Sequence, residues 1–362
     1  MKITIDCRFL NASGVGVYLQ GCLPYFLDSP HSFLLLGDAE KLRCFTAGHK
    51  NCAVIPCGIK PFSIAELLAF PAHLKRAINK TDLYYSPYFN IPGGVTVPVY
   101  TTIHDIIFPD MPELVSKAGL AARMWFYHRA FRRSKKIFTV SHFSKSRIEH
   151  FLGNIKPVVV THTAILPYLL DFQKIEKTEK ILFIGNIKKH KGLSYLLDAF
   201  IAARAEGLPH KLVIVGSKDN FRSADTSMPA KLEQADSFGV EFTGLLSNEK
   251  LKTLLAEAAL LVQPSLYEGF GLPPLEAMVT GTQALVSDIP VFKEIYDVFP
   301  VTFFRAGDVS DLKEKLMNLL YAQEPRNLVL SDDLAEKYTF KKTAAIILEN
   351  IHEACPATLL TA

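Results

Sequence analysis

Two glutamates, Glu268 and Glu276, stand eight positions apart in a segment that combines glycine, aromatic and proline residues. A Gly-Phe-Gly turn and a Pro-Pro pair lie between them, and a helix-forming stretch begins near the second glutamate. The dipole of a helix favours an anion in its first turn. The pattern therefore predicts a corner between a strand and a helix that binds a polyhydroxylated ligand, with Glu268 in the corner and Glu276 in the first helical turn.

Gly14 and Gly16 follow the first predicted strand and open a helical stretch. Glycines at such a place let the backbone approach a phosphate group, and the N-terminus of the helix offers free N–H donors. Taken alone this is a weak signal, because tight turns between a strand and a helix use glycine for conformational reasons. Phosphate binding is predicted here only in combination with a second group of phosphate ligands.

A basic loop at residues 185–192 supplies that second group, because it follows the first predicted strand of the second half of the chain. It contains Asn186, Lys188 and Lys191. Lys191 stands just before Gly192 and a new helix, so its ammonium group can reach a diphosphate that faces this turn. A solvated basic loop would explain any one of the lysines, but not why the cluster falls at the carboxyl end of a strand.

His104 ends a predicted apolar strand at residues 99–104. A single histidine is more often structural than functional, but ligands of α/β sheets bind at the carboxyl ends of parallel strands. We therefore predict that His104 hydrogen-bonds a sugar hydroxyl or polarises the reacting centre. Ser141 or Ser144, at the start of a later helix, is predicted to be the N-cap of that helix.

The chain contains no D-x-D triplet. Carboxylates usually hold the Mg²⁺ or Mn²⁺ ion that assists chemistry on a nucleotide diphosphate. We therefore expect no metal and no other cofactor, and we expect Lys191, backbone N–H groups and helix dipoles to meet the charge of the diphosphate.

The elements that must position these residues alternate between short strands and helices in two blocks. Such alternation predicts two parallel-sheet α/β domains that face each other across a cleft, with ligands at the carboxyl ends of strands. We predict a first domain over residues 1–170 and a second over 175–340, with a helix at about 341–362 that packs back on the first. The predicted strands are residues 2–6, 32–36, 54–56, 83–86, 99–104, 137–140, 158–161, 181–184, 212–215, 240–242, 260–263, 284–287 and 301–303. The predicted helices are residues 18–27, 117–132, 144–152, 193–206, 229–237, 250–258, 311–322 and 341–353.

Length and composition limit the class of protein. The 362 residues suit two domains, and 49% apolar with 21% charged residues are normal for a globular protein. No apolar run approaches the roughly 18 residues of a membrane span, and the N-terminus reads as a strand rather than a signal peptide. The six cysteines form no zinc pattern, so we expect a reduced, cytoplasmic setting.

Charge is distributed unevenly along the chain. Residues 1–170 carry 19 Lys and Arg against 10 Asp and Glu, whereas the remainder carries 21 against 26. The densest basic segment, residues 123–136, is interpreted in two ways. It is either a helix with one core face and one solvated face or a helix on the inner surface of a membrane, where aromatic and cationic side chains suit the headgroup boundary. Nucleic acid is not an expected partner, because no nucleic-acid motif accompanies the charge.

Together these segments resemble the retaining glycosyltransferases of the GT-B fold in the large family numbered four, group 1, and its mannosyltransferase-like subfamily in particular. The similarity covers nearly the whole chain. The E-x7-E segment at residues 264–278 is highly specific, whereas the glycine loop at residues 13–18 is not. The other matching segments are residues 102–105, 139–144 and 185–192.

The resemblance implies a role for each site residue. Glu276 would accept hydrogen bonds from the donor ribose, and Glu268 would lie against the transferred sugar. Lys191 would neutralise the leaving diphosphate, and His104 would contact the sugar near its anomeric centre. The implied catalytic residues are His104, Glu268 and Lys191, and the implied donor-binding residues are Gly14, Gly16, Asn186, Lys188, Lys191, Gly269, Phe270, Gly271, Leu272 and Glu276.

We therefore predict a cytoplasmic, metal-independent transferase that moves a hexose from a nucleotide-diphosphate sugar to a glycan or lipid-linked acceptor. It would retain the anomeric configuration and act in bacterial surface-polysaccharide synthesis, with peripheral contact with the inner membrane face. GDP-mannose is the favoured donor, ahead of UDP-glucose and dTDP-rhamnose.

Two other functions stay open at this point. Asn186, Val17 and Gln283 depart from the residues that many relatives carry, which leaves room for a non-catalytic nucleotide-sugar-binding subunit of a heteromeric transferase. A dehydrogenase with two Rossmann domains is disfavoured. Residues 13–18 lack a full G-x-G-x-x-G, and no acid ends a strand about 20 residues further on.

Overall fold

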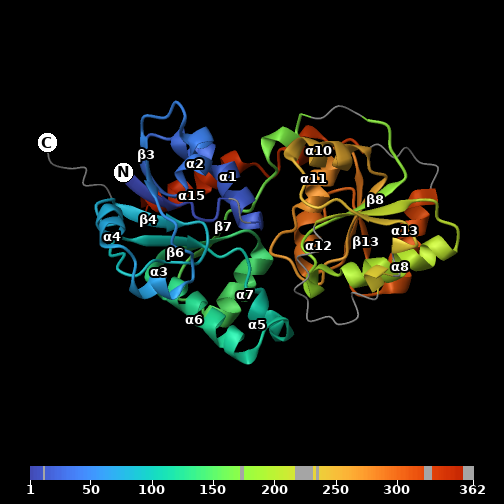
Figure 1. Cartoon of the computed structure of the whole chain (residues 1–362), viewed down its shortest axis with the longest axis horizontal. Helices are drawn as coiled ribbons and strands as arrows, with labels where there is room; N and C mark the ends of the chain where they lie inside the picture. The colour runs from blue at the N-terminus through green and yellow to red at the C-terminus, as the bar shows by residue number, and fades with distance from the viewer. Residues whose placement is uncertain (11–12, 172–174, 217–230, 234–235, 322–327, 354–362) are drawn as a thin grey trace. The chain divides into compact units, whose positions relative to one another are not determined.

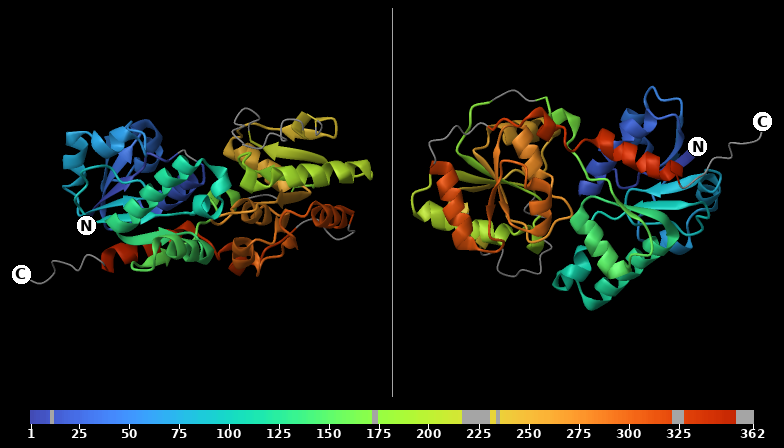
Figure 2. Two further views of the ribbon diagram at one scale, coloured as in Figure 1. Left: turned by 90° about the horizontal axis from the view of Figure 1, so that it is seen from below. Right: turned by 180° about the vertical axis from the view of Figure 1, so that it is seen from behind.

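The computed structural model describes residues 1–10, 13–171, 175–216, 231–233, 236–321 and 328–353 (Figure 1). The chain divides into two compact units, one made of Met1–Ala164 with the segment from Tyr338 onward, the other of Ile165–Lys337. Each unit is built on its own parallel sheet with helices on both faces (Figures 1 and 2). The predicted class, two Rossmann-like α/β domains, is confirmed.

The first unit holds a seven-stranded sheet in the order β3-β2-β1-β4-β5-β6-β7. Every strand pair in it is parallel, and β1 is the first strand of the chain and lies near the middle of the sheet. The strand predicted at residues 99–104 ends at Thr102, so His104 lies in the loop that follows it. The strands are β1 (Lys2–Asp6), β2 (Ser32–Gly37), β3 (Cys52–Pro56), β4 (Leu83–Ser86), β5 (Val99–Thr102), β6 (Ser134–Thr139) and β7 (Val158–Val160).

Helices cover both faces of this sheet, and the last described helix of the chain is one of them. α15 (Phe340–Glu353) packs against α1 (Ser13–Leu27), which brings the C-terminal segment onto the first unit (Figure 2). Serine caps α7, because the hydroxyl of Ser141 accepts from the backbone N–H of Ser144, as predicted. The other helices are α2 (Ala39–Thr46), α3 (Ile64–Leu68), α4 (Ala72–Ile78), α5 (Ile107–Asp110), α6 (Lys117–Arg133) and α7 (His142–Leu152).

The second unit holds a six-stranded parallel sheet in the order β10-β9-β8-β11-β12-β13. The strands are β8 (Lys180–Ile184), β9 (Lys211–Val215), β10 (Val240–Phe242), β11 (Leu260–Gln263), β12 (Gln283–Ser287) and β13 (Thr302–Phe304). The helices are α8 (Leu193–Ala205), α10 (Asn248–Glu257), α11 (Pro273–Val279), α12 (Pro290–Tyr296), α13 (Val309–Tyr321) and α14 (Asp332–Ala335). The helix predicted at residues 229–237 falls partly outside the described residues.

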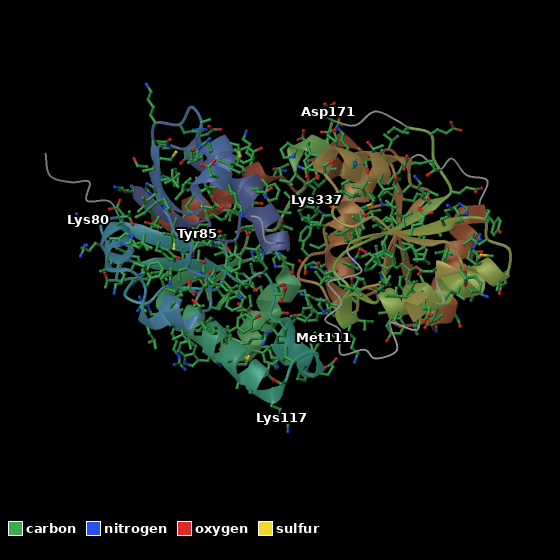
Figure 3. All side chains as sticks on the ribbon, in the orientation of Figure 1. Lys80, Tyr85, Met111, Lys117, Asp171 and Lys337 are labelled. Carbon is green, nitrogen blue, oxygen red and sulfur yellow. The ribbon has the colours of Figure 1, made fainter. Side chains whose placement is uncertain are left out.

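The interior of each unit is apolar on both sides of its sheet, which is typical of parallel sheets covered by helices. Strand β2 shows this directly, with Leu34, Leu35 and Leu36 all buried in succession. In the first unit Tyr85 lies in the interior, whereas Lys80 and Lys117 project from the surface (Figure 3). Over the described residues, no helix combines the length and the apolar character that crossing a membrane requires.

Candidate functional site

The second sheet reverses its strand order between β8 and β11, and loops at such a switch point form the ligand site of α/β sheets. The basic loop at residues 185–192 leaves β8, and the segment with Glu268 leaves β11. The backbone N–H of Leu266 donates to the carbonyl of His190 at 2.7 Å. Two motifs that lie far apart in the sequence are therefore joined at the place where a ligand is expected.

Gly192 allows this close approach. It ends a short 3-10 turn over Lys189–Lys191 with φ of 70°, in the left-handed region that favours glycine. A Cβ atom at this position would stand 1.8 Å from the carbonyl oxygen of Pro264, the residue after β11. Only glycine lets the turn pack directly on the backbone of the corner, and this packing puts Lys191 next to Glu268.

Lys191 and Glu268 form an ion pair at this switch point. The ammonium nitrogen of Lys191 lies 2.7 Å from each carboxylate oxygen of Glu268. Both side chains are largely buried, and Glu268 is only 8% exposed. An ammonium group has three donors. With two donated to one carboxylate, the third remains for a ligand.

Neighbouring side chains fix the carboxylate of Glu268 further. The hydroxyl of Ser265 donates to its Oε1 at 2.8 Å, and the amide of Gln263 donates to the same oxygen at 3.3 Å. Gln263 ends β11, and Ser265 is itself fully buried. The carboxylate is therefore held in one orientation by the strand end before any ligand arrives, as preorganised binding requires.

Glu276 is placed in the first turn of α11, as predicted. Burial raises the pKa of Glu276 to about 7. Burial is the main cause that raises the pKa of Tyr168 to about 12, and the negative charge of Glu276 adds to it. The two groups are therefore neighbours. Within the described residues Glu276 has no ion pair with Lys191 and no side-chain bond to Glu268. The structure thus joins the first glutamate to the lysine and leaves the second available.

The corner between the two glutamates includes Gly269, Phe270, Gly271 and Leu272. Leu272 is the N-cap residue of α11. Phe270 is buried, and the hydroxyl of Tyr296 on α12 donates to the carbonyl of Gly271. The corner is therefore held from outside by a helix that the sequence patterns did not predict.

His190, which the sequence patterns passed over, lies in the same basic loop. Its Nδ1 atom is buried and has no hydrogen-bond partner among the described residues. Burial, followed by the charges of Lys191 and Lys188, lowers the pKa of His190 to about 4, although Glu268 opposes this. A neutral imidazole therefore stands beside the ion pair. Its place next to Lys191 was the only signal in the sequence.

Asn186 and Lys188 belong to the exposed part of the loop. The backbone N–H of Lys188 donates to the carbonyl of Asn186 at 2.9 Å, which tightens the turn after β8. Neither side chain is drawn into the Lys191–Glu268 pair, so both can move toward a ligand. Within the described residues no cluster of three or more His, Cys, Asp and Glu side chains could hold a metal ion.

Gly14 and Gly16 lie in the first turns of α1, in the first unit. Gly14 is exposed, and a Cβ atom there would meet nothing within 4 Å. Gly16 is buried, and a Cβ atom there would stand 2.6 Å from the carbonyl oxygen of Leu10. The close approach that requires glycine at position 16 is thus to the protein's own backbone, whereas Gly14 leaves open space.

His104 follows β5 in the first unit and is half-buried. Its Nε2 lies 2.8 Å from the carbonyl oxygen of Pro87, and its ring meets the edge of Tyr18 at 4.9 Å between centroids. Burial lowers the pKa of His104 to about 4. Since a carbonyl oxygen can only accept, Nε2 carries the proton, and Nδ1 is the acceptor that His104 can offer to a hydroxyl group.

The basic segment at residues 123–136 covers most of α6 and the start of β6. Tyr127, Ala130 and Phe131 form its core face. Arg129 donates to the carbonyl of Ile91 at 2.7 Å, so part of the positive charge serves the fold. The remaining exposed side chains of the segment include Trp125, Arg132 and Lys135.

Residues 171–331 match the family described as glycosyl transferases group 1. Among curated proteins, the chain is 31% identical over 200 residues to the O-antigen chain mannosyltransferase RfbU of Salmonella typhimurium, covering 54% of this chain and 53% of that protein. It is 29% identical over 232 residues to O-antigen chain mannosyltransferase B of Escherichia coli, covering 60% of this chain and 59% of that one. The chain thus spans just over half the length of these two relatives.

Solved structures of the same architecture match over nearly the whole chain. Sucrose-phosphate synthase from Thermosynechococcus elongatus matches with a TM-score of 0.74 at 15% identity, covering 98% of this chain and 99% of that one. Anabaena HepE in complex with UDP and glucose matches with a TM-score of 0.70 at 16% identity, covering 98% and 100%. At these identities the likeness concerns the fold, and the GT-B fold predicted from the sequence is confirmed.

Proposed function

Residues 171–331 match the glycosyl transferases group 1 family, and from this match we propose that the chain is a retaining hexosyltransferase. Its donor is a nucleotide-diphosphate sugar, and its acceptor is a glycan or a lipid-linked glycan of bacterial surface polysaccharide. No metal takes part in the reaction.

The contact between Lys191 and Glu268 carries this proposal. It supplies a fixed cation at the switch point of the second sheet, with a carboxylate of fixed orientation beside it. When the glycosidic bond to the diphosphate breaks, negative charge develops on the leaving group. A preorganised ammonium group stabilises that charge without reorganising at the moment of reaction.

Glu268 and Glu276 are assigned to the hydroxyl groups of the donor. The carboxylate of Glu268, oriented by Ser265 and Lys191, accepts from a hydroxyl of the transferred sugar. Glu276 accepts from the two hydroxyls of the ribose. Each such charge-assisted bond contributes about 1.5–3 kcal/mol to binding.

His104 of the first unit is assigned to the sugar near its anomeric centre, with Nδ1 accepting from a hydroxyl. The carboxylate of Glu268 accepts from Lys191, Ser265 and Gln263, and these bonds make it a weak nucleophile. Attack by the acceptor on the face from which the diphosphate leaves would retain the configuration, and we propose this course.

A mannose donor is supported by relatives, because both O-antigen relatives are named mannosyltransferases. GDP-mannose is therefore the first donor to test, followed by UDP-glucose and dTDP-rhamnose. The same names support a surface-polysaccharide acceptor.

A peripheral contact with the cytoplasmic face of the membrane through residues 123–136 is part of the proposal. Trp125 is 52% exposed, and Arg132 and Lys135 are exposed near it in the sequence. An amphipathic aromatic group with cations beside it suits an anionic headgroup layer. The protein should sediment together with vesicles that contain phosphatidylglycerol, and the double variant Trp125→Ala, Arg132→Gln should not. Full vesicle binding by the double variant would contradict this membrane contact.

The transfer itself is tested with the purified chain, each of the three sugar nucleotides and a lipid-linked glycan acceptor. The expected product has the same anomeric configuration as the donor that supplied the hexose, identified by NMR of the anomeric centre. A product of the opposite configuration would contradict retention. Thermal-shift measurements with GDP, UDP and dTDP identify the nucleotide independently, because a ligand that binds only the folded state raises the melting temperature.

A non-catalytic nucleotide-sugar-binding subunit is the second candidate. It is favoured by one observation, that the exposed Asn186 brings no charge to the basic loop, which leaves Lys191 as the main cation for the diphosphate. Donor binding without transfer or hydrolysis by the purified chain would support it.

A further inference from the structure

The switch point of the first sheet is filled by the protein's own charged side chains. The strand order of this sheet reverses between β1 and β4, the place where α/β sheets usually bind ligands. Asp6 ends β1, Arg8 follows it, and Glu66 approaches from α3. Asp6 and Glu66 are 0% exposed, and the side chain of Arg8 is 3% exposed, so none of them is open to a ligand.

Arg8 holds the two carboxylates together. Its Nε and Nη2 atoms donate to the two oxygens of Asp6 at 2.9 and 2.5 Å, and Nη2 also donates to Glu66 at 2.6 Å. Its Nη1 donates to the carbonyl of Ile59 at 3.0 Å. A buried group of charges is a poor source of stability, because desolvation opposes the Coulomb attraction. The cluster therefore points to a role other than stability.

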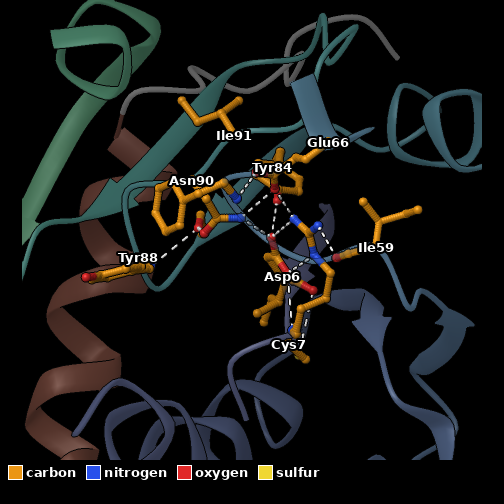
Figure 4. Close-up of polar contacts among 12 residues, drawn as sticks. Asp6, Cys7, Ile59, Glu66, Tyr84, Tyr88, Asn90 and Ile91 are labelled. Carbon is orange, nitrogen blue, oxygen red and sulfur yellow. Dashed lines mark hydrogen bonds and ion pairs between the residues drawn. The ribbon is translucent and has the colours of Figure 1, made fainter. Parts of the chain in front are cut away.

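Asn90 ties this cluster to the loop after β4. Its amide nitrogen donates to Asp6 at 2.8 Å and to Glu66 at 3.0 Å. Its amide oxygen accepts from the hydroxyl of Ser86, the last residue of β4, at 3.0 Å. Asp6, Glu66, Tyr84 and Asn90 point toward one another in Figure 4. We call Asp6, Arg8, Glu66 and Asn90 the switch-point network.

The turn between Ser86 and Asn90 is thus held at both ends. Within it, the backbone N–H of Tyr88 donates to the hydroxyl of Ser86 at 3.3 Å. Pro87 lies between Ser86 and Tyr88, and its ring fixes φ, which limits the conformations open to the turn. That carbonyl accepts from Nε2 of His104 at 2.8 Å.

The Pro87 contact decides which nitrogen of His104 carries the proton. With Nε2 as the donor, Nδ1 stays unprotonated and has no hydrogen-bond partner among the described residues. If the Pro87 carbonyl turned away, the imidazole could change tautomer and present a donor instead of an acceptor.

We propose that the switch-point network positions His104 through Asn90 and the Ser86–Asn90 turn, holding the Pro87 carbonyl on Nε2 and so fixing the Nε2–H tautomer. Asn90 and Ser86 are then positioning residues for the sugar contact. The effect on turnover rests on the proposed function, whereas the effect on the tautomer does not.

The test reads the tautomer directly. The whole chain with ¹⁵N-labelled histidine is studied by long-range ¹H–¹⁵N correlation at pH 7.5, and the His104 signals are assigned by their loss in His104→Gln. We expect the Nε2–H form in the wild type. In Asn90→Ala we expect a mixture with the Nδ1–H form, together with at least a fivefold fall in kcat and a donor KM within twofold.

Ser86→Ala is the milder variant, because it removes the bond to Asn90 but leaves the charged groups in place, and it should shift the tautomer in the same direction. Tyr84→Phe is the control, because the Tyr84 hydroxyl bonds Asp6 without touching the turn. It should keep the Nε2–H form.

An unchanged tautomer in both Asn90→Ala and Ser86→Ala would overturn the proposal. An equal shift in Tyr84→Phe would also overturn it, since the effect would then not pass through Asn90. If the wild type neither binds nor transfers any hexose while the tautomer shifts as expected, the proposed function fails and the positioning role stands.

Discussion

The ammonium nitrogen of Lys191 lies 2.7 Å from both oxygens of Glu268, across 77 positions of sequence. The lysine comes from the loop after β8 and the glutamate from the corner after β11. The pair makes the corner nearly neutral without a ligand and orients both groups. A diphosphate would then meet a lysine that is already in place, while the sugar meets a carboxylate that Ser265 keeps oriented.

Replacing Lys191 tests whether this cation stabilises the leaving group. Lys191→Ala should lower kcat at least tenfold, because a charge-assisted bond that strengthens as the diphosphate leaves contributes about 1.5–3 kcal/mol. Stability should fall by about 1–2 kcal/mol, since the partly exposed pair is broken but Glu268 keeps Ser265 and Gln263. Steady-state kinetics with the donor and circular dichroism measure the two effects.

Lys189→Ala is the matched control, because Lys189 is exposed in the same loop, outside the pair and not assigned to the donor. It should keep turnover within threefold. If Lys191→Ala turned over the donor as fast as the wild type, the assignment of Lys191 to the active site would be contradicted.

Glu276 should give donor binding a pH dependence near neutrality. Burial raises the pKa of Glu276 to about 7, and the protonated group loses acceptor capacity for the ribose hydroxyls. The ionised fraction, and with it the donor affinity, should fall about tenfold between pH 8 and pH 6. Calorimetric titration with the nucleoside diphosphate measures this affinity. Glu276→Gln should bind the nucleoside diphosphate weakly, with an affinity that does not change over the same pH range. A wild-type affinity that rises toward pH 6 would contradict the assignment.

The same group affects stability with a defined sign. The pKa of Glu276 in the folded chain lies above its usual value, so the folded state binds more protons between pH 4.5 and pH 7. Its contribution to stability is present at the low end of this window and is lost as the pH rises through about 7.

Gly192 should tolerate no side chain. In Gly192→Ala the Cβ atom would collide with the carbonyl of Pro264, 1.8 Å away, and the backbone would keep φ of 70°. The loop must then move away from the corner, so the free energy of unfolding of the second unit should fall by more than about 3 kcal/mol. Hydrogen exchange of peptides from residues 181–215, read by mass spectrometry, reports this loss.

Gly207→Ala separates backbone strain from collision, because Gly207 also has positive φ but a Cβ atom there meets nothing within 4 Å. It should cost only about 1 kcal/mol. Equal effects of the two variants would show that the contact with Pro264 does not matter.

Much of the fold could be predicted because parallel strands buried on both faces are short apolar runs. β1, β4, β10 and β11 have the predicted bounds. Several short helices were missed, among them α12, because seven residues with two turns give too little periodicity to separate a helix from a loop. This matters for the site, since Tyr296 of α12 holds the corner.

The pairing within the site was less accessible to sequence reasoning. The types of Lys191 and Glu268 indicated their chemistry, but the contact between them depends on strand order, which no local pattern contains. The switch-point network was missed for the same reason. Asp6, Glu66 and Asn90 are scattered over 84 positions and carry no shared spacing.

Metal removal tests how the charge of the diphosphate is met. If Lys191 and backbone donors carry that task, dialysis against EDTA should leave the transfer rate within twofold of its starting value. The measurement is product formation before and after dialysis, with added Mg²⁺ or Mn²⁺ as the comparison. A strict requirement for Mn²⁺ would contradict this mechanism.

Arg8 should be far more important to stability than an exposed arginine. Arg8→Met leaves Asp6 and Glu66 buried without their cation, and breaking a buried charge pair in this way costs about 3–5 kcal/mol. Arg43→Met removes the exposed Arg43–Glu40 pair and should cost about 0–1 kcal/mol. The single tryptophan of the chain, Trp125, lies in the first unit, so its fluorescence during urea unfolding reports on this unit.

At acid pH the free energies of unfolding of Arg8→Met and the wild type should lie closer together than at neutral pH. Burial by itself raises the pKa of Asp6, but the Arg8 guanidinium and the bonds from Tyr84 and Asn90 bring it below its usual value. In the wild type the stability that Asp6 contributes is therefore present above about pH 3.9 and lost as the pH falls through the lower folded pKa. In Arg8→Met only the bonds from Tyr84 and Asn90 still oppose the effect of burial on the pKa of Asp6. The folded state therefore takes up a proton more readily as the pH falls, and the variant regains stability. Urea unfolding at pH 7.5 and pH 5 measures the free energy of unfolding of the wild type and of Arg8→Met. The difference between the two proteins should be smaller at pH 5. A larger difference at pH 5 would mean that Arg8 does not neutralise the two carboxylates.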